Sequence, residues 1–219
     1  MRAQTSSLDG TGAFAPSGAA TVHAAFARPV ADAQQCFRAA LAALSEPGIP
    51  ALLAQAPLHA PEGLSPCLYA LCLSLCDMET ALWLSPRFSH PEIRVNLSFH
   101  CGCRFASARE EADFALMAAE ELEDISGFSI GSERYPDRSC TILCAIPSLF
   151  GGPRMSWHGP GIENRRDAQL PIPEIFWRQR AEKNDFPRGI DVFFAAEDEC
   201  ALVGLPRTTR ANHRIEEAR

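Results

Sequence analysis

The chain has 219 residues, 47% of them hydrophobic and 21% charged, and these proportions are typical of a globular protein. Its formal net charge of −7 disfavours nucleic acid and anionic membranes as partners, because both carry negative charge themselves. The sequence contains no apolar run long enough to cross a bilayer and opens without a secretory signal, so we expect a cytoplasmic protein.

The N-terminal third predicts a leader and two helices. Residues 1–22 are rich in Ala, Ser, Thr and Gly and lack periodicity, which predicts a flexible leader. Apolar side chains at helical spacing predict a helix over Ala31–Leu44. Its expected buried face carries Phe37, Ala40, Leu41 and Leu44. A second helix is expected to begin at Pro66, with Ser65 as its N-cap.

The middle of the chain predicts two strands, a helix and a third strand. Ala81–Leu84 is a short apolar run, and Ile93–Phe99 alternates apolar with polar residues, as a strand with one buried face does. A capping-box pattern of Ser and Glu opens a predicted helix over Ser107–Glu121. Cys140–Ile146 is mostly apolar and contains β-branched residues, which is typical of a strand buried on both faces.

The C-terminal part predicts a helix and a hairpin. A helix is expected over Pro171–Asn184, and the apolar runs Ile190–Ala195 and Ala201–Leu205 flank an acidic turn, which predicts an antiparallel hairpin. Because helices and strands mingle over residues 23–210, we expect a single α/β domain there. Its mixed sheet would be flanked by helices in a three-layer α/β/α arrangement. Residues 211–219 are expected to form a charged tail.

Nine cysteines are many for a chain of this size. Their odd number and their positions in apolar runs predict buried, reduced thiols. Cys101 and Cys103 beside His100 could form half of a metal site, but such a site needs a second pair of ligands. Cys140 and Cys144 would lie about 13 Å apart along one strand, so they could not share an ion. We therefore expect no metal site.

Several known catalytic and cofactor-binding motifs occur in the sequence, but the predicted structure around each does not suit its function. Gly127–Gly131 fits the G-x-S-x-G pattern of a nucleophile elbow, but a predicted helix precedes it where a strand is required. Gly10–Ala15 loosely fits a dinucleotide fingerprint without a preceding strand. Lys183, the only lysine, lies in a polar stretch that is unsuited to a Schiff base with pyridoxal phosphate, so we expect no cofactor. Asp77 and Glu79 could form a carboxylate pair, although a polar turn explains them better.

The main candidate site comprises two short segments. Glycines in the segment His158–Gly161 allow backbone amides to approach an anion closely, although a tight turn also explains them. His158 could add a proton donor or a charge. The guanidinium and hydroxyl groups of the segment Arg207–Thr209 suit a phosphate or carboxylate, or a salt bridge at a subunit contact. The candidates for anion binding or subunit contact are His158, Gly159, Gly161, Arg207, Thr208 and Thr209.

Several short stretches between Phe26 and Thr209 follow one another in the order found in a known bacterial family. They are Phe26 with Pro29-Val30, Phe37-Arg38, Glu46-Pro47-Gly48, Asp77 with Glu79-Thr80, Ala112-Asp113-Phe114, His158-Gly159-Pro160-Gly161-Ile162, Phe186-Pro187-Arg188-Gly189-Ile190-Asp191 and Leu205-Pro206-Arg207-Thr208-Thr209. Each stretch is weak alone, but their number and order together are specific. The chain therefore resembles the PhnH family of the bacterial carbon–phosphorus lyase system.

The resemblance implies a mainly structural subunit of the carbon–phosphorus lyase core complex, which associates with subunits G, I and J and forms a homodimer when isolated. It also implies a part in forming alpha-D-ribose 1-methylphosphonate 5-triphosphate from ATP and methylphosphonate, a reaction that this chain is not expected to catalyse alone. The implied fold is the large domain of pyridoxal-phosphate-dependent transferases, without the cofactor. The alternative is a stand-alone hydrolase or transferase with an anion pocket near His158 and Arg207.

Overall fold

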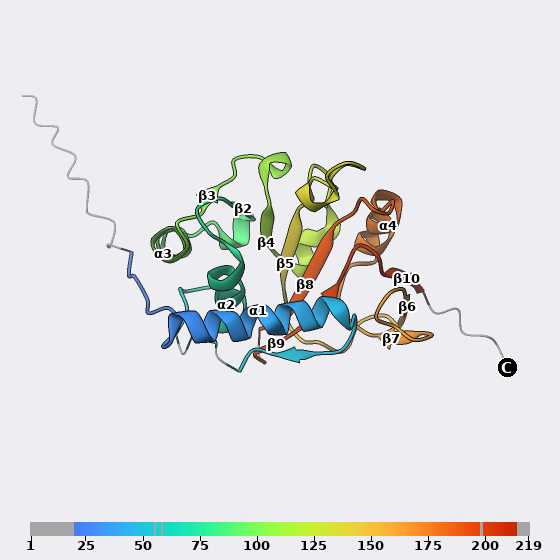
Figure 1. Cartoon of the computed structure of the whole chain (residues 1–219), viewed down its shortest axis with the longest axis horizontal. Coiled ribbons are helices and arrows are strands. Elements are labelled where there is room, and N and C mark those ends of the chain that lie inside the picture. The colour runs from blue at the N-terminus through green and yellow to red at the C-terminus, as the bar shows by residue number, and fades with distance from the viewer. Residues whose placement is uncertain (1–19, 55, 58, 198, 214–219) are drawn as a thin grey trace, which may run out of the picture.

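The chain folds around two β-sheets, which the computed structural model describes for residues 20–213 except 55, 58 and 198 (Figure 1). The larger sheet has seven strands in the order β1-β9-β8-β5-β4-β2-β3. Its strands are β1 (Ala51–Leu52), β2 (Ala81–Leu84), β3 (Arg104–Phe105), β4 (Phe114–Ala118), β5 (Thr141–Ile146), β8 (Asp191–Ala196) and β9 (Ala201–Leu205). The strands from β3 to β8 run parallel, whereas β9 and β1 pair antiparallel. The expected α/β fold with a mixed sheet is therefore confirmed.

Two separate cores lie on the two faces of the large sheet. Helices α1 (Pro29–Ser45), α2 (Pro66–Leu75) and α3 (Pro91–Cys101) pack into one core. Helix α4 (Glu174–Lys183) packs into the other core with a three-stranded sheet. The strands of this small sheet are β10 (Arg210–His213), β6 (Met155–His158) and β7 (Arg166–Ala168). Successive residues of β5 alternate between the two cores, as the pleat of a strand requires.

Short 3-10 helices connect these elements, at Pro86–Phe88, Arg109–Glu111, Ala119–Glu123 and Pro136–Arg138. Within the described ranges, no helix is both long and apolar enough to span a membrane. Most of the expected leader and tail, residues 1–19 and 214–219, lies outside the described residues. Strand β10 extends to His213, which is past the expected start of the tail.

Several expected elements are confirmed. Helix α2 begins at Pro66, and the Ser65 hydroxyl accepts a hydrogen bond from the Leu68 amide at 3.3 Å, as an N-cap does. The strands β2 and β5 and the antiparallel β8–β9 hairpin also lie where the sequence places them. Helix α4 begins after Pro173, later than expected, because a proline keeps the residue before it out of helical geometry.

Helix α1 is confirmed, and Ala40 on its expected buried face is buried, but Phe37 and Leu41 of the same face are not. Phe37 and Leu41 are 45% and 51% exposed. The buried side chains of the helix are Asp32, Cys36, Ala40 and Ala43. Small residues there let the helix approach β9 closely, and a Cβ added to Gly204 would stand only 2.4 Å from the Ala43 carbonyl oxygen. Close backbone contact, rather than the size of the apolar side chains, therefore sets the buried face.

The strand expected at Ile93–Phe99 is wrong, because these residues form the middle of helix α3. At the start of the helix, the His90 side chain accepts a hydrogen bond from the Glu92 amide, and Pro91 occupies the first turn. Gly102 ends the helix with a φ of 66°. The buried residues are Ile93, Asn96 and Leu97. Residues four apart share a face in both a helix and a strand, so alternation alone is ambiguous here.

The helix expected over Ser107–Glu121 is also wrong. Its centre, Phe114–Ala118, forms strand β4, which pairs with β2 on one side and β5 on the other. Glu121 accepts a hydrogen bond from the Ala118 amide at 2.8 Å, just past the end of the strand. The strand is buried on both faces, and a short apolar run of that kind has no period that separates it from a helix.

The small sheet was not expected from the sequence, because its strands are short and carry several polar residues. In this sheet β6 and β10 pair antiparallel, with His158 opposite Arg210. The pairing brings together two segments that are far apart in the sequence.

Replacing Gly204 with alanine is expected to lower the free energy of unfolding by about 3 kcal/mol, because the new Cβ would press on the Ala43 carbonyl and force α1 away from β9. Urea unfolding followed by circular dichroism measures this change. Gly63→Ala is the control, since Gly63 has a positive φ but open space around its Cβ, and backbone strain alone costs about 1 kcal/mol. Equal losses in the two variants would contradict the steric explanation.

Candidate functional site

The candidate residues meet at a cavity of about 780 Å³. Five of the six candidates line it, namely His158, Gly159, Arg207, Thr208 and Thr209. The other lining residues are Pro160, Trp177, Arg180, Ala181, Asn184, Asp185, Phe186, Arg210, Ala211 and Asn212. Gly161 is not among them and lies against the end of α1, where an added Cβ would stand 2.0 Å from the Ser45 carbonyl oxygen. The two segments singled out in the sequence are therefore neighbours in the fold.

Two glycines allow the segments around this cavity to pack closely on one another. A Cβ added to Gly159 would lie 2.9 Å from the Thr208 carbonyl oxygen. A Cβ added to Gly189 would lie 2.8 Å from the Cβ of Arg207. Three of the stretches that carry the family resemblance thus pack directly on one another, which explains why glycine is required in two of them.

His158 has both ring nitrogens engaged within the protein. Its Nδ1 lies 3.0 Å from the Asn164 carbonyl oxygen, which can only accept, so Nδ1 carries a proton. Its Nε2 lies 3.0 Å from the Ser156 hydroxyl. In the neutral ring Nε2 accepts from that hydroxyl. This arrangement fixes the imidazole and leaves neither nitrogen in position to act as a general base on a ligand.

Arg207 is held by a carboxylate and a carbonyl from other segments. Its Nε and Nη2 donate to Asp191 at 3.1 and 2.5 Å, and its backbone amide donates to the same carboxylate at 2.6 Å. Its Nη1 donates to the Pro136 carbonyl. The side chains of Arg207 and Asp191 are only 17% and 15% exposed. These contacts favour a structural role for Arg207 over capture of an external anion.

Arg180 is the lining residue that sequence reasoning missed. It lies on α4, is only 4% exposed, and donates from Nη1 to the Thr209 carbonyl at 2.9 Å and from Nη2 to the Pro206 carbonyl at 2.7 Å. Among the described residues, no carboxylate forms an ion pair with it. A signal was present, because Arg180 follows the core residues Phe176 and Trp177 by four and three positions and so shares their helical face.

Burial disfavours the charged form of Arg180. Desolvation lowers the pKa of Arg180 to about 10, and the negative charge of Asp191 opposes this shift only in part. A guanidinium in water would stay fully charged well above that pH. The charge on Arg180 is therefore poorly compensated by the protein around it.

Several buried hydrogen-bond donors without a partner lie close together beside the cavity. The Nε of Arg180, the hydroxyl of Thr209 and the indole nitrogen of Trp177 are buried and have no partner in the described structure. The indole nitrogen of Trp157 is also buried without a partner, and the centroids of the Trp157 and Trp177 rings lie 6.2 Å apart. Buried donors without partners are rare in folded proteins, so a cluster of them points to groups that the protein itself does not supply.

Two other candidate motifs have structural roles. The Ser129 hydroxyl of the G-x-S-x-G stretch donates to the Arg138 carbonyl at 2.9 Å and accepts from the Gly131 amide at 3.2 Å, so it forms part of a loop as expected. An Asp77 carboxylate oxygen accepts from the backbone amides of Glu79 and Thr80 at 2.9 and 3.1 Å. This is the polar turn favoured over a carboxylate pair.

The cysteines are free thiols, and seven of the nine are buried. Cys101 lies beside Cys72, with its thiol 3.6 Å from the Cys72 carbonyl oxygen. A hydrogen bond with the Cys76 thiol, followed by burial, raises the pKa of Cys72. Cys72 and Cys76 therefore form a second pair of thiols beside Cys101. In the described part of the chain, no group of three or more His, Cys, Asp or Glu residues is placed to hold a metal ion.

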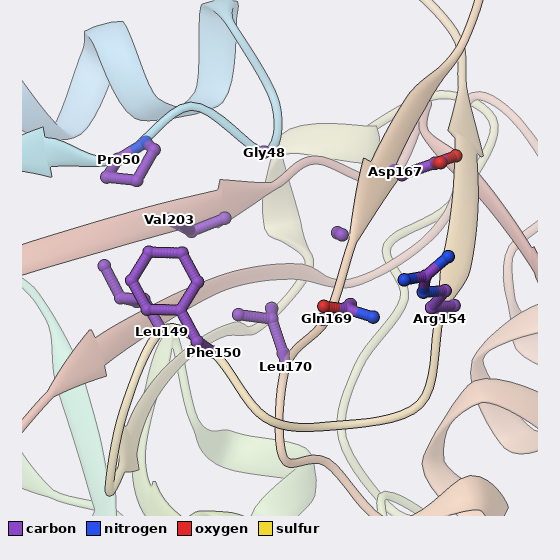
Figure 2. Close-up of a pocket in the computed structure, with 10 residues that line it drawn as sticks. Gly48, Pro50, Leu149, Phe150, Arg154, Asp167, Gln169, Leu170 and Val203 are labelled. Atoms are coloured by element: carbon purple, nitrogen blue, oxygen red, sulfur yellow. The ribbon is translucent and has the colours of Figure 1, made fainter.

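A second cavity of about 380 Å³ lies between the small sheet and the β5–β6 connection (Figure 2). Figure 2 shows apolar side chains, including Phe150 and Val203, on one side and Arg154, Gln169 and Asp167 on the other. Arg154 and Asp167 are the only charged residues among the described ones that line it. It therefore offers fewer polar groups than the first cavity.

Comparison with known proteins agrees with the resemblance read from the sequence. The model of a family described as bacterial phosphonate metabolism protein (PhnH) matches residues 24–212. The chain is 35% identical to the alpha-D-ribose 1-methylphosphonate 5-triphosphate synthase subunit PhnH of Rhizobium meliloti, over 85% of this chain and 93% of that protein. It is 32% identical to a protein of Stutzerimonas stutzeri provisionally named C-P lyase subunit protein HtxG, over 82% of this chain and 85% of that protein.

Asp191→Asn is expected to lower the free energy of unfolding by about 2–3 kcal/mol, because it removes the counter-charge of Arg207 at a largely buried position. Glu120→Gln is the matched control, since Glu120 pairs with Arg87 at an exposed site where such a change costs about 0.5 kcal/mol. Urea denaturation compares the two variants with the native chain. Similar losses in both variants would show that the Arg207–Asp191 pair has no special structural role.

Proposed function

The chain belongs to the PhnH family of bacterial phosphonate metabolism proteins, and on that basis we propose that it is a mainly structural subunit of the carbon–phosphorus lyase machinery. Both named relatives are subunits, and each is matched over more than four fifths of its length. Their names support a place in phosphonate catabolism within a multi-subunit assembly.

One observation carries the structural part of this proposal. The polar groups of His158 and Arg207 are taken up by contacts with Ser156, Asn164 and Asp191 inside the chain. Residues that carry the family resemblance therefore fix the walls of the cavity in place. A catalytic acid or base would need at least one of these groups to face a substrate.

The finer features of the proposal follow from the relative's name and from the resemblance. The assembly would form alpha-D-ribose 1-methylphosphonate 5-triphosphate from ATP and methylphosphonate in the cytoplasm. The partners of this chain would be subunits G, I and J, with a homodimer as the isolated form. Residues 23–210 would act as one unit, with a fold like the large domain of pyridoxal-phosphate-dependent transferases and without a cofactor of their own.

An exposed apolar stripe supports the assembly. Val30, Phe37 and Leu41 lie on one side of α1, outside the buried set of Asp32, Cys36, Ala40 and Ala43, and are all exposed. Leu52 on the neighbouring edge strand β1 is exposed too. Apolar patches of this kind are typical of protein–protein contacts, so we assign this stripe to the contact with another subunit.

A stand-alone hydrolase or transferase is the second candidate. The 780 Å³ cavity favours it, because small-molecule sites have volumes in that range. The engaged nitrogens of His158 weigh against it.

The proposal predicts that the purified chain retains subunits G, I and J in a pull-down at moderate salt. By itself the chain should release no adenine, the group that leaves ATP when the phosphonate is joined to the ribose. A Phe37→Asp, Leu41→Asp double variant should lose at least tenfold in retention, because two charges would be placed in an apolar contact. The control is Gln35→Asp, at an exposed position away from the stripe on the same helix.

Failure of the native chain to retain any of the subunits would contradict the structural proposal. Adenine release by the isolated chain would instead support the second candidate. Equal retention of the double variant and the control would show that the stripe on α1 is not the subunit contact. The proposal of a structural subunit would still stand.

A further inference from the structure

The 780 Å³ cavity has an excess of positive charge. Three arginines and one aspartate line it. Arg207 is neutralised by Asp191, and Asp185 is paired with Arg188, so these two lining residues bring no net charge. Arg180 and Arg210 remain, and neither forms an ion pair with a described carboxylate. Two guanidinium groups without an ion-pair partner thus line one concave site.

The two groups lie at different depths. Arg180 is 4% exposed and forms part of the buried wall, next to the unpaired hydroxyl of Thr209. Arg210 is exposed at the start of β10, opposite His158 in the β6–β10 pair. A ligand that enters the cavity therefore meets one arginine at the rim and one at the wall.

The donors of Arg180 are only partly used. Its Nη1 and Nη2 each donate to a carbonyl oxygen, which leaves Nε and one further N–H on each terminal nitrogen without a partner. Carbonyl oxygens satisfy hydrogen bonds but do not cancel a full positive charge. An anion with several oxygens would supply both the missing acceptors and the missing charge.

We propose that this cavity binds the tetrahedral oxyanion of a phosphate or phosphonate group, with Arg180 and Thr209 at its buried wall and Arg210 at its rim. The choice of a phosphonate as one of the ligands rests on the proposed function, whereas the anion site itself rests on the arrangement of these residues. The ligand is a small molecule rather than a partner's carboxylate, because the volume of the cavity is that of a small-molecule site.

The size of the cavity also leaves room for the organic part of such a ligand. The Phe186 ring lines the cavity and is 75% exposed. An aromatic surface beside an anion site suits a molecule that joins an apolar or planar group to its phosphate. The site thus fits an organic phosphate better than a simple ion.

Isothermal titration of the full chain with inorganic phosphate, with methylphosphonate and with acetate tests the proposal. We expect saturable binding of the first two and none of acetate, a monovalent planar anion. Arg210→Ala should weaken phosphate binding at least tenfold. Arg178→Ala, an exposed arginine of α4 outside this cavity, is the matched control and should leave the affinity unchanged.

Arg180→Lys is the second variant, because alanine at this buried position risks unfolding the chain. It keeps the charge and should still weaken binding, since a lysine lacks the planar set of donors. Absence of phosphate and methylphosphonate binding by the native chain would overturn the proposal, and so would equal affinity in Arg210→Ala and Arg178→Ala.

The same preparations distinguish this failure from failure of the proposed function. A native chain that retains the other subunits but binds neither anion would refute the anion site alone. A chain that binds phosphate and retains no subunit would refute the structural proposal and leave the anion site in place.

Discussion

A single buried guanidinium holds together the region on which the candidate site depends. Arg180 of α4 donates to the carbonyl oxygens of Pro206 and Thr209, and so ties the helix to the loop that follows the β8–β9 hairpin. The Arg207–Asp191 pair ties the same loop to the start of β8. Strand β10 begins directly after this loop, so the position of the small sheet depends on these contacts as well. Arg180 therefore holds together the segments that form the cavity.

The structural role of Arg180 and its proposed role toward a ligand have the same physical cause. An arginine reaches two carbonyl oxygens at once because its donors lie in one fixed plane, which a lysine cannot imitate. Burial without a carboxylate partner lowers its pKa to about 10 and makes the charged form costly. A bound oxyanion would relieve that cost. Arg180 thus both positions the loop and carries a buried positive charge that an anionic ligand would stabilise.

The sequence predicted the fold best where a local pattern is compatible with only one kind of secondary structure. The start of helix α2 at Ser65-Pro66 and the β8–β9 hairpin were predicted because caps and turns act on their immediate neighbours. Helix α3 and strand β4 were predicted wrongly, since short apolar patterns fit both periods and tertiary pairing decides between them.

The place of the site was predicted, but the roles of its residues were not. His158 and Arg207 do line one cavity, yet their partners come from Asn164, Pro136 and Asp191, and no sequence pattern announces such distant contacts. Arg180 could have been found from its helical spacing to Phe176, because an arginine on a core-facing stripe signals a buried charge. The structural role of Arg180 can be tested directly. Amide hydrogen exchange in the native chain and in Arg180→Lys is the most direct measurement. The amides of Arg207 and Thr209 report on the loop, since they donate to Asp191 and to the Pro206 carbonyl. We expect both amides to exchange at least about tenfold faster in the variant, while amides of β5 keep their rates. Unchanged exchange at both amides would contradict the role of Arg180 in holding the loop.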